Sequence, residues 1–201
     1  MDTNIKVILF DLGRVLMHID FENFPNGLGL KINEERMQFD HAKIQKSVRM
    51  YETGNISTNE FLDSLYEIFQ HKYSRNKILE AYNGIIVADN FEIIPFVEEA
   101  ARRYRIAVLS NTCPCHWEKV LRVSSLIKIF PEVFTSFHLG AMKPESIVYE
   151  KVCASLNVQP HEVLFIDDLK ENVEGAISAG MKGIIFSSAL QLQNDFKNQT
   201  W

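Results

Sequence analysis

The chain has 201 residues, 46% of them hydrophobic, so it is long enough for one compact domain with a smaller insertion and too apolar for a disordered protein. A formal net charge of −5 gives no electrostatic basis for binding nucleic acid or an anionic membrane surface. The apolar run before Asp11 is too short for a signal peptide or a transmembrane helix. Cys113, Cys115 and Cys153 are predicted to be free thiols in a reducing cytoplasm, because the first two have no second pair to complete a zinc site.

Short apolar runs, each followed by a polar or small residue, predict strands that are buried on both faces, as in a parallel sheet between two layers of helices. They span residues 7–10, 106–109, 163–166 and 183–186, with a weaker candidate at 133–137. Helical periodicity separates them, over residues 92–104, 145–156 and 171–179. The alternation predicts a doubly wound, Rossmann-like α/β fold.

Residues 15–88 interrupt this alternation with several amphipathic helical segments and no convincing buried strand. Ser57 and Glu60 have the spacing of a capping box and predict the start of one such helix. We therefore predict a helical cap domain over residues 15–88, inserted after the first strand of a core domain that comprises residues 1–14 and 89–201. The polar end of the chain, from residue 191, is expected to be loosely attached.

Polar residues occupy the carboxyl ends of the predicted strands, which is where open α/β sheets bind their ligands. Carboxylate oxygens suit Mg²⁺, and hydroxyl and ammonium groups bind phosphoryl oxygens. Two adjacent acids at a buried sheet edge are also costly without a cation. The set predicts a site for a phosphate group and a divalent cation, and its members are Asp11, Ser110, Asn111, Lys143, Asp167 and Asp168.

Four segments in chain order resemble the motifs of the haloacid dehalogenase (HAD) superfamily: ILFDLGRVL, VLSNT, LGAMKP and VLFIDDLKENVEGAISAG. The resemblance extends from residue 6 to residue 186. The predicted insertion is similar to the type 1 cap of that superfamily. Residues 51–61, YETGNISTNEF, resemble the Glu-x-Gly-x-Ile-Ser segment in the caps of the glucose-1-phosphatase-like subgroup, and FDLGRVLMHIDF resembles that subgroup's first motif.

The resemblance implies a Mg²⁺-dependent phosphatase in which Asp11 attacks phosphorus and forms an aspartyl-phosphate. Asp11, the backbone carbonyl of Gly13 and Asp168 would bind Mg²⁺, and Asp167 would bind it directly or through water. Asn172 stands where many relatives carry another acid, so it is expected to have an indirect role at most.

The resemblance also implies a set of phosphate-binding residues. Ser110 would hydrogen-bond the phosphoryl group with Asn111 beside it, and Gly13 would lie against it. Lys143 would neutralise the charge on both the nucleophile and the phosphoryl oxygens, which is an electrostatic contribution to catalysis. The partner implied is a small phosphorylated metabolite, with no nucleic acid and no membrane.

Gly13 departs from the pattern, because most phosphatases of this superfamily carry a second Asp there that protonates the leaving group and activates water. Such acid–base help is worth about 10²- to 10⁴-fold in rate. His18 and Asp20 are the nearest titratable residues in the sequence, although ordinary roles where the chain enters the cap are favoured for both. A sugar-1-phosphate would ease the loss, because an anomeric oxygen leaves more readily than a simple alcohol.

Three other functions are weighed against the phosphatase. A dehalogenase of the same fold would use Asp11 on carbon without a metal, and the paired acids argue against it. A non-catalytic phosphate-binding or regulatory protein is supported by Gly13 alone. A phosphomutase would need the acid–base group that Gly13 replaces.

Overall fold

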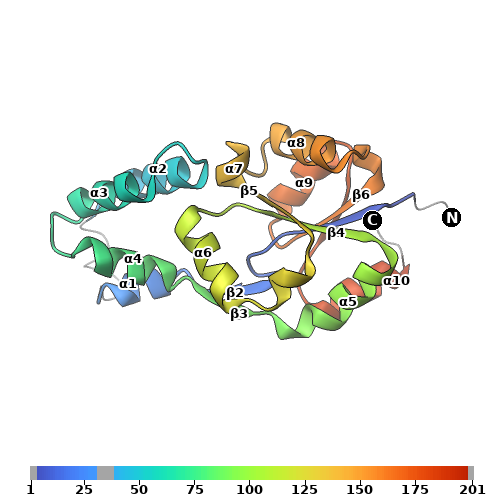
Figure 1. Cartoon of the computed structure of the whole chain (residues 1–201), viewed down its shortest axis with the longest axis horizontal. Helices are drawn as coiled ribbons and strands as arrows, with labels where there is room; N and C mark the ends of the chain where they lie inside the picture. Colours follow the sequence, from blue (N-terminus) through green and yellow to red (C-terminus); the bar gives the residue numbers. More distant parts are fainter. Residues whose placement is uncertain (1–3, 31–38, 199–201) are drawn as a thin grey trace.

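The computed structural model describes residues 4–30 and 39–198. A parallel five-stranded sheet in the order β5-β4-β1-β6-β7 lies at one end of the elongated molecule (Figure 1). Its strands are β1 (Val7–Phe10), β4 (Arg105–Ser110), β5 (Glu132–Thr135), β6 (Val163–Asp167) and β7 (Lys182–Ile185). The predicted doubly wound α/β fold is confirmed, and β5 ends two residues earlier than predicted.

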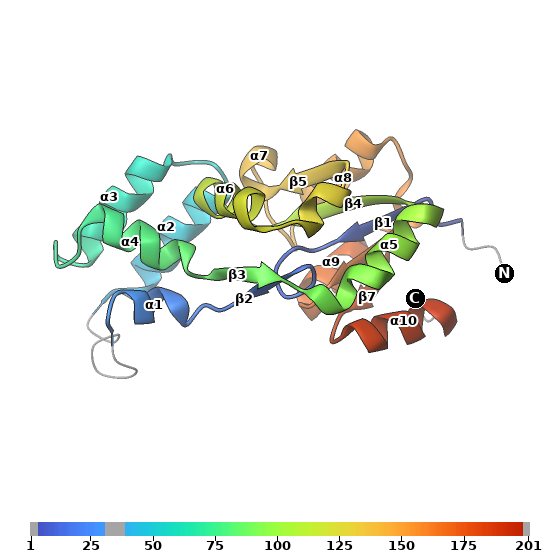
Figure 2. The ribbon, with the colours of Figure 1, turned by 60° about the horizontal axis from the view of Figure 1, so that its bottom comes forward.

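Helices cover both faces of this sheet (Figures 1 and 2). Successive side chains of β1 alternate between the faces: Ile8 and Phe10 join one apolar cluster, and Val7 and Leu9 join the other. The first cluster includes residues of α5 (Ile94–Arg103), α6 (Pro114–Val123) and α10 (Ala189–Asn198). The second includes residues of α8 (Ser146–Leu156) and α9 (Lys170–Ser178). The short elements are η1 (Phe91–Ile93), η2 (Leu126–Ile129), α7 (Ser136–Leu139) and η3 (Pro160–Glu162).

Four helices lie to one side of the sheet and share an apolar cluster of their own (Figure 1). They are α1 (Asn23–Gly27), α2 (His41–Glu52), α3 (Thr58–Ile68) and α4 (Arg75–Asn83). The expected capping box begins α3: Glu60 N donates to Ser57 Oγ, and Ser57 N donates to Glu60 Oε2 at 2.7 Å. The helical insertion after the first strand is thus present. We propose that it is a cap domain that comprises residues 15–88.

Two features differ from the sequence-based expectations. The chain enters and leaves the insertion through an antiparallel ribbon, β2 (Met17–Ile19) and β3 (Ile86–Asp89), where no strand was predicted because the runs are short. Residues 191–198, which were expected to be loosely attached, belong to helix α10. Leu192 of that helix is fully buried, and Phe196 packs on Phe96. Residues 199–201 lie outside the described part of the chain.

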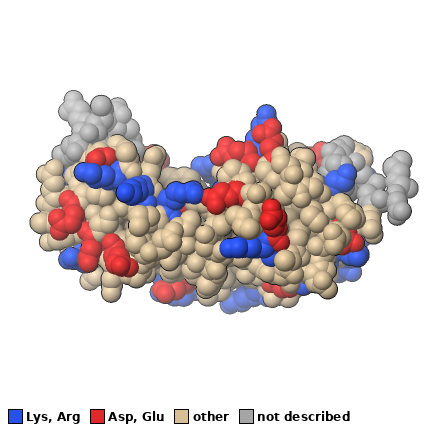
Figure 3. Space-filling view, turned by 90° about the horizontal axis from the view of Figure 1, so that it is seen from above, with Lys and Arg blue, Asp and Glu red and all other residues tan. Residues whose placement is uncertain are grey.

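The surface carries mixed charge. On the face shown in Figure 3, basic side chains lie beside acidic ones across both halves of the molecule. Within residues 4–30 and 39–198, no helix is both long and apolar enough to cross a membrane.

Asp89, the last residue of β3, caps the segment at the start of η2. Its carboxylate accepts hydrogen bonds from the Ser124 hydroxyl, from the hydroxyl and backbone N–H of Ser125, and from the backbone N–H of Leu126. Burial raises the pKa of Asp89, but these hydrogen bonds outweigh it and leave the pKa below its usual 3.8. The folded state is therefore stabilised by this carboxylate above about pH 4, and the contribution is lost as the pH falls through the lower folded-state pKa.

Replacing Asp89 with alanine should lower the free energy of unfolding by about 1–3 kcal/mol at pH 7, because buried donors lose their acceptor. Urea unfolding at pH 7 and at pH 3.5 measures this loss, which should be smaller at the lower pH. Glu98→Ala, at an exposed position of α5, is the control. Equal unfolding midpoints for Asp89→Ala and wild type at pH 7 would contradict the prediction.

Candidate active site

The carboxyl ends of β4, β1 and β6 lie side by side, because these strands are neighbours in the sheet. Asp11 follows β1 directly, Ser110 is the last residue of β4, and Asp167 is the last residue of β6. All three are buried. The Ser110 hydroxyl has one weak contact in the described part of the chain, to the Asn111 carbonyl at 3.5 Å, so it can still donate to a ligand.

Lys143 is buried at the centre of this group. Its Nζ lies 2.5 Å from Asp11 Oδ1 and 2.6 Å from Asp167 Oδ2, and it donates to the Leu109 carbonyl at 3.1 Å. Desolvation lowers the pKa of Lys143, but the two carboxylates outweigh it and raise the pKa overall. The ammonium group is therefore charged and binds the two acids to each other.

Asn111 fixes the loop that carries Lys143. The backbone N–H of Lys143 donates to Asn111 Oδ1 at 2.9 Å, and Asn111 Nδ2 donates to the Lys143 carbonyl at 3.0 Å. Both polar groups of the amide are engaged with the backbone of the lysine. The geometry thus gives Asn111 a positioning role, although the sequence placed it beside the phosphoryl group.

Asp167 is held by protein groups at both of its carboxylate oxygens. Its Oδ1 accepts from the Leu169 N–H at 2.8 Å and from Asn172 Nδ2 at 3.0 Å. Its Oδ2 accepts from Lys143 and, at 3.1 Å, from Asn172 Nδ2. The Asn172 amide is thus shared between the two oxygens, and both oxygens of Asp167 are engaged by the protein.

The residues present fit a divalent cation. Carboxylate oxygens of Asp11, Asp167 and Asp168 lie within 4.8 Å of one another. Burial and the neighbouring Asp167 raise the pKa of Asp168, and Arg14, 3.6 Å away, opposes this shift. Burial also raises the pKa of Asp11, against the effect of Lys143. Three clustered carboxylates thus face one buried ammonium and one half-exposed guanidinium, an excess of negative charge that a hard cation would offset.

The space beside Gly13 is tight for the acid that usually stands at its position. A Cβ atom built on Gly13 would lie 3.0 Å from Cδ1 of Ile19, whose side chain occupies that direction. The two titratable residues nearest in sequence do not replace it: His18 and Asp20 are exposed, and neither lines the two cavities described next.

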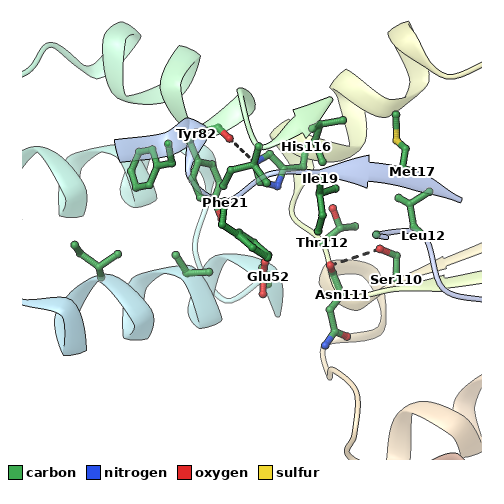
Figure 4. Close-up of a pocket in the computed structure, with 16 residues that line it drawn as sticks. Leu12, Met17, Ile19, Phe21, Glu52, Tyr82, Ser110, Asn111, Thr112 and His116 are labelled. Atoms are coloured by element: carbon green, nitrogen blue, oxygen red, sulfur yellow. Dashed lines mark hydrogen bonds between the residues drawn. The ribbon is translucent and has the colours of Figure 1, made fainter. Parts of the chain in front are cut away.

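Two adjoining cavities open at this edge of the sheet, between the sheet and the helical insertion. The smaller, of about 200 Å³, contains the acids and Lys143; it is lined by Asp11, Gly13, Arg14, Ile19, Phe21, Glu52, Asn111, Met142, Lys143, Asp168, Leu169 and Asn172. The larger, of about 270 Å³, shares Gly13, Ile19, Phe21, Glu52 and Asn111 with it (Figure 4). The rest of its lining is mostly apolar, apart from Ser110, Thr112 and His116.

The cavity lining includes residues that sequence reasoning missed. Phe21, to which the sequence assigned no role, lines both cavities. Glu52 of α2 lines both cavities, and in Figure 4 it faces Asn111 from the opposite wall. The signal for Glu52 was present in the segment YETGNISTNEF, but no role was assigned to it.

His116 lines the larger cavity, and its ring is neutral near pH 7. Burial lowers the pKa of His116 to about 4. Its Nε2 lies 2.9 Å from the Tyr82 carbonyl, and its ring stacks on the Tyr82 ring. His116 thus forms part of the wall of the larger cavity as a neutral ring.

Comparisons with known proteins agree with one another. A family model described as haloacid dehalogenase-like hydrolase matches residues 5–180. A phosphatase of Mycobacterium tuberculosis is 31% identical over 200 residues, which cover 95% of this chain and 91% of that protein. A D-ribitol-5-phosphate phosphatase of Bacteroides thetaiotaomicron is 25% identical over 179 residues, 84% of this chain and 85% of that protein. A HAD family enzyme of the same bacterium, solved with magnesium and inorganic phosphate, has a TM-score of 0.77 and 24% identity, covering 92% of this chain and 95% of that one.

Proposed function

Because the chain belongs to the haloacid dehalogenase-like hydrolases and is a phosphatase of that family, we propose that it hydrolyses a small phosphomonoester through an aspartyl-phosphate on Asp11, with Mg²⁺ as cofactor. The observation that carries this proposal is the buried contact of Lys143 with Asp11 and Asp167. It supports the proposal because a carboxylate that could serve as nucleophile and a buried positive charge lie side by side at the end of β1, in the lining of a cavity.

Asp11 attacks phosphorus with a carboxylate oxygen, and Lys143 balances the negative charge that gathers on the phosphoryl oxygens. Asp167 does not contact the substrate in this proposal, because its oxygens are filled by Lys143, Leu169 and Asn172. It keeps the ammonium group in position and so supports the electrostatic part of the reaction. Ser110 donates its hydroxyl to a phosphoryl oxygen.

Asp11, Asp168 and the backbone carbonyl of Gly13 would hold Mg²⁺, and Asp167 would contribute at most through water. When bound, the cation offsets charge on the phosphoryl oxygens and orients the group for in-line attack. The carboxylate cluster supports this assignment, and so does the relative of similar fold that was solved with magnesium and phosphate.

The organic part of the substrate is proposed to lie in the larger cavity. A sugar-1-phosphate stays a candidate on the basis of leaving-group chemistry, because its anomeric oxygen leaves more readily than the oxygen of a simple alcohol. The apolar lining, which includes Phe21, Phe24 and Ile44, favours instead an organic group with an apolar face. Both classes therefore belong in a substrate panel. The three free thiols are consistent with the cytoplasmic setting that we propose.

Phosphate release from a panel of sugar-1-phosphates, sugar-5-phosphates, alkyl phosphates and 4-nitrophenyl phosphate tests the function. We expect release that stops on chelation with EDTA and returns when excess Mg²⁺ is added, since the carboxylate cluster then regains its cation. Release that is indifferent to EDTA would contradict the metal assignment. No release from any member would favour a phosphate-binding protein, and chloride release from a 2-haloacid would favour a dehalogenase.

A further inference from the structure

The site lacks an obvious proton donor for the leaving group. The titratable or charged residues that line the smaller cavity are Asp11, Arg14, Glu52, Lys143 and Asp168. Asp11 is the proposed nucleophile, Asp168 a proposed metal ligand, Lys143 is held by two carboxylates, and arginine does not deprotonate in proteins. Glu52 is the carboxyl group in this lining that the mechanism leaves unused.

Glu52 lies where the leaving group must emerge. It borders both the cavity that contains Asp11 and the larger cavity proposed for the organic part of the substrate. The ester oxygen joins these two parts, so it must sit where the cavities meet. Ile19, which fills the space beside Gly13, lines both cavities as well. The acid thus stands at the same junction as the missing side chain, but on the opposite wall.

The end of α2 is fixed against the core, which is what a positioned catalytic group requires. Gly54 has a φ of +71°, and a Cβ atom on it would lie 2.4 Å from the Phe137 carbonyl oxygen. Only glycine therefore lets the backbone at residue 54 come this close to Phe137. One turn before Glu52, Arg49 forms an ion pair with Glu145 at 2.6 Å and contacts Met142 Sδ at 3.0 Å. Met142 precedes Lys143, so the Glu52 segment is tied to the catalytic loop.

We propose that Glu52, supplied by the cap, is the general acid and base that replaces the side chain absent at Gly13. This inference rests on the proposed phosphatase function. Asp11 forms a bond to phosphorus as the bond from phosphorus to the ester oxygen breaks, and the Glu52 carboxylic acid gives its proton to that oxygen. The Glu52 carboxylate then takes a proton from a water molecule whose oxygen attacks phosphorus. The Asp11–phosphorus bond breaks, and inorganic phosphate leaves with both side chains restored.

The electrostatic surroundings suit both halves of this cycle. Burial raises the pKa of Glu52 to about 7, against the opposing effect of Arg49 on the same helix. A group with that pKa is present as acid and as carboxylate in comparable amounts near neutral pH. Among the described residues, no hydrogen bond or ion pair to the Glu52 carboxyl is found. The other titratable or charged groups around it are Asp11, Arg14, Tyr82, Lys143 and Asp168, with Cys113 and the neutral His116 behind the larger cavity.

Glu52→Gln tests the role through the leaving group. Protonation matters for an alkoxide and little for 4-nitrophenolate, which leaves as an anion. We expect kcat/KM for an alkyl phosphate to fall on the order of 10²- to 10⁴-fold, and for 4-nitrophenyl phosphate to fall far less. The alkaline limb of the pH profile of kcat/KM, where Glu52 loses the proton that it gives to the ester oxygen, should disappear. Glu52→Asp, which keeps the carboxyl group, should recover part of the alkyl phosphate activity.

Glu80→Gln is the matched control, because it removes an exposed carboxylate from the same insertion on α4 and should leave every rate unchanged. Thermal melting of each variant confirms folding. Equal losses of kcat/KM with both leaving groups, a change in KM alone, or an unaltered pH profile of kcat/KM in Glu52→Gln would overturn the proposal. If wild type and Glu80→Gln release no phosphate from either substrate, the phosphatase function itself fails. If wild type is active and Glu52→Gln is equally active, the phosphatase function stands and only the role of Glu52 fails.

Discussion

Asp11→Asn should abolish phosphate release, with a loss in kcat on the order of 10⁴-fold or more, as when a nucleophile is removed from a covalent mechanism. The amide keeps the volume of the carboxyl group beside Lys143, so the fold should persist. It cannot form an acyl phosphate, and it is a poorer ligand for a hard cation. Because Asp11 must form the bond to phosphorus whichever leaving group departs, alkyl and aryl phosphates should lose activity alike.

This equality separates Asp11 from Glu52, whose loss should depend on the leaving group. Steady-state kinetics with both substrates measures it. A second readout is the covalent intermediate: rapid acid quench of wild type with ³²P-labelled substrate should trap label on the protein, and Asp11→Asn should trap none. Asp20→Asn is the control, because this acid is exposed, lies outside both cavities and should leave the rates unchanged. Label retained by Asp11→Asn would contradict the assignment of the nucleophile.

Lys143→Met should be both slower and less stable than wild type. The substitution leaves the buried carboxylates of Asp11 and Asp167 without their common partner. Breaking a buried ion pair by removing one member costs roughly 3–5 kcal/mol, because the remaining charge is uncompensated. Loss of a fixed charge at the developing oxyanions should lower kcat on the order of 10²- to 10³-fold.

Urea unfolding in EDTA and in excess Mg²⁺ measures the stability effect. The cation should restore part of the stability of Lys143→Met, since it offers the carboxylates another positive charge. Lys151→Met is the control. Lys151 is exposed on α8, and within the described part of the chain its ammonium group donates only to the backbone carbonyl of Leu139. An unfolding midpoint for Lys143→Met equal to that of wild type would show that Asp11 and Asp167 do not need the ammonium group.

Much of the fold could be predicted because its signals are local. The run Val7–Phe10 is apolar at every position, which is typical of a strand buried on both faces, and Ser57 with Glu60 specifies a helix start within four residues. The C-terminal helix was missed for the opposite reason. Leu192 and Phe196 are isolated in a polar segment, and their burial depends on α5, which is distant in the sequence.

The roles of two site residues also depended on distant groups. The sequence placed Asn111 near the phosphoryl group and left Asp167 with a direct or water-mediated contact to the metal. In the structure, the amide of Asn111 is engaged by the backbone of Lys143, and the oxygens of Asp167 are filled by Lys143, Leu169 and Asn172. Residue type indicates that a group is polar, but only its neighbours determine whether it has capacity left for a ligand.

For Asp11, Ser110, Lys143 and Asp168, the sequence by itself determined the positions at the sheet edge, because each follows or ends a strand or lies in the loop after one, and parallel strands bring their carboxyl ends together. The tertiary structure alone decided what stands opposite them. Whether Glu52 faces the site depends on how α2 is oriented over the sheet. The end of α2 meets the core where Gly54 approaches Phe137 and where Arg49 pairs with Glu145. These contacts join residues more than eighty positions apart, and no local pattern in the sequence encodes them.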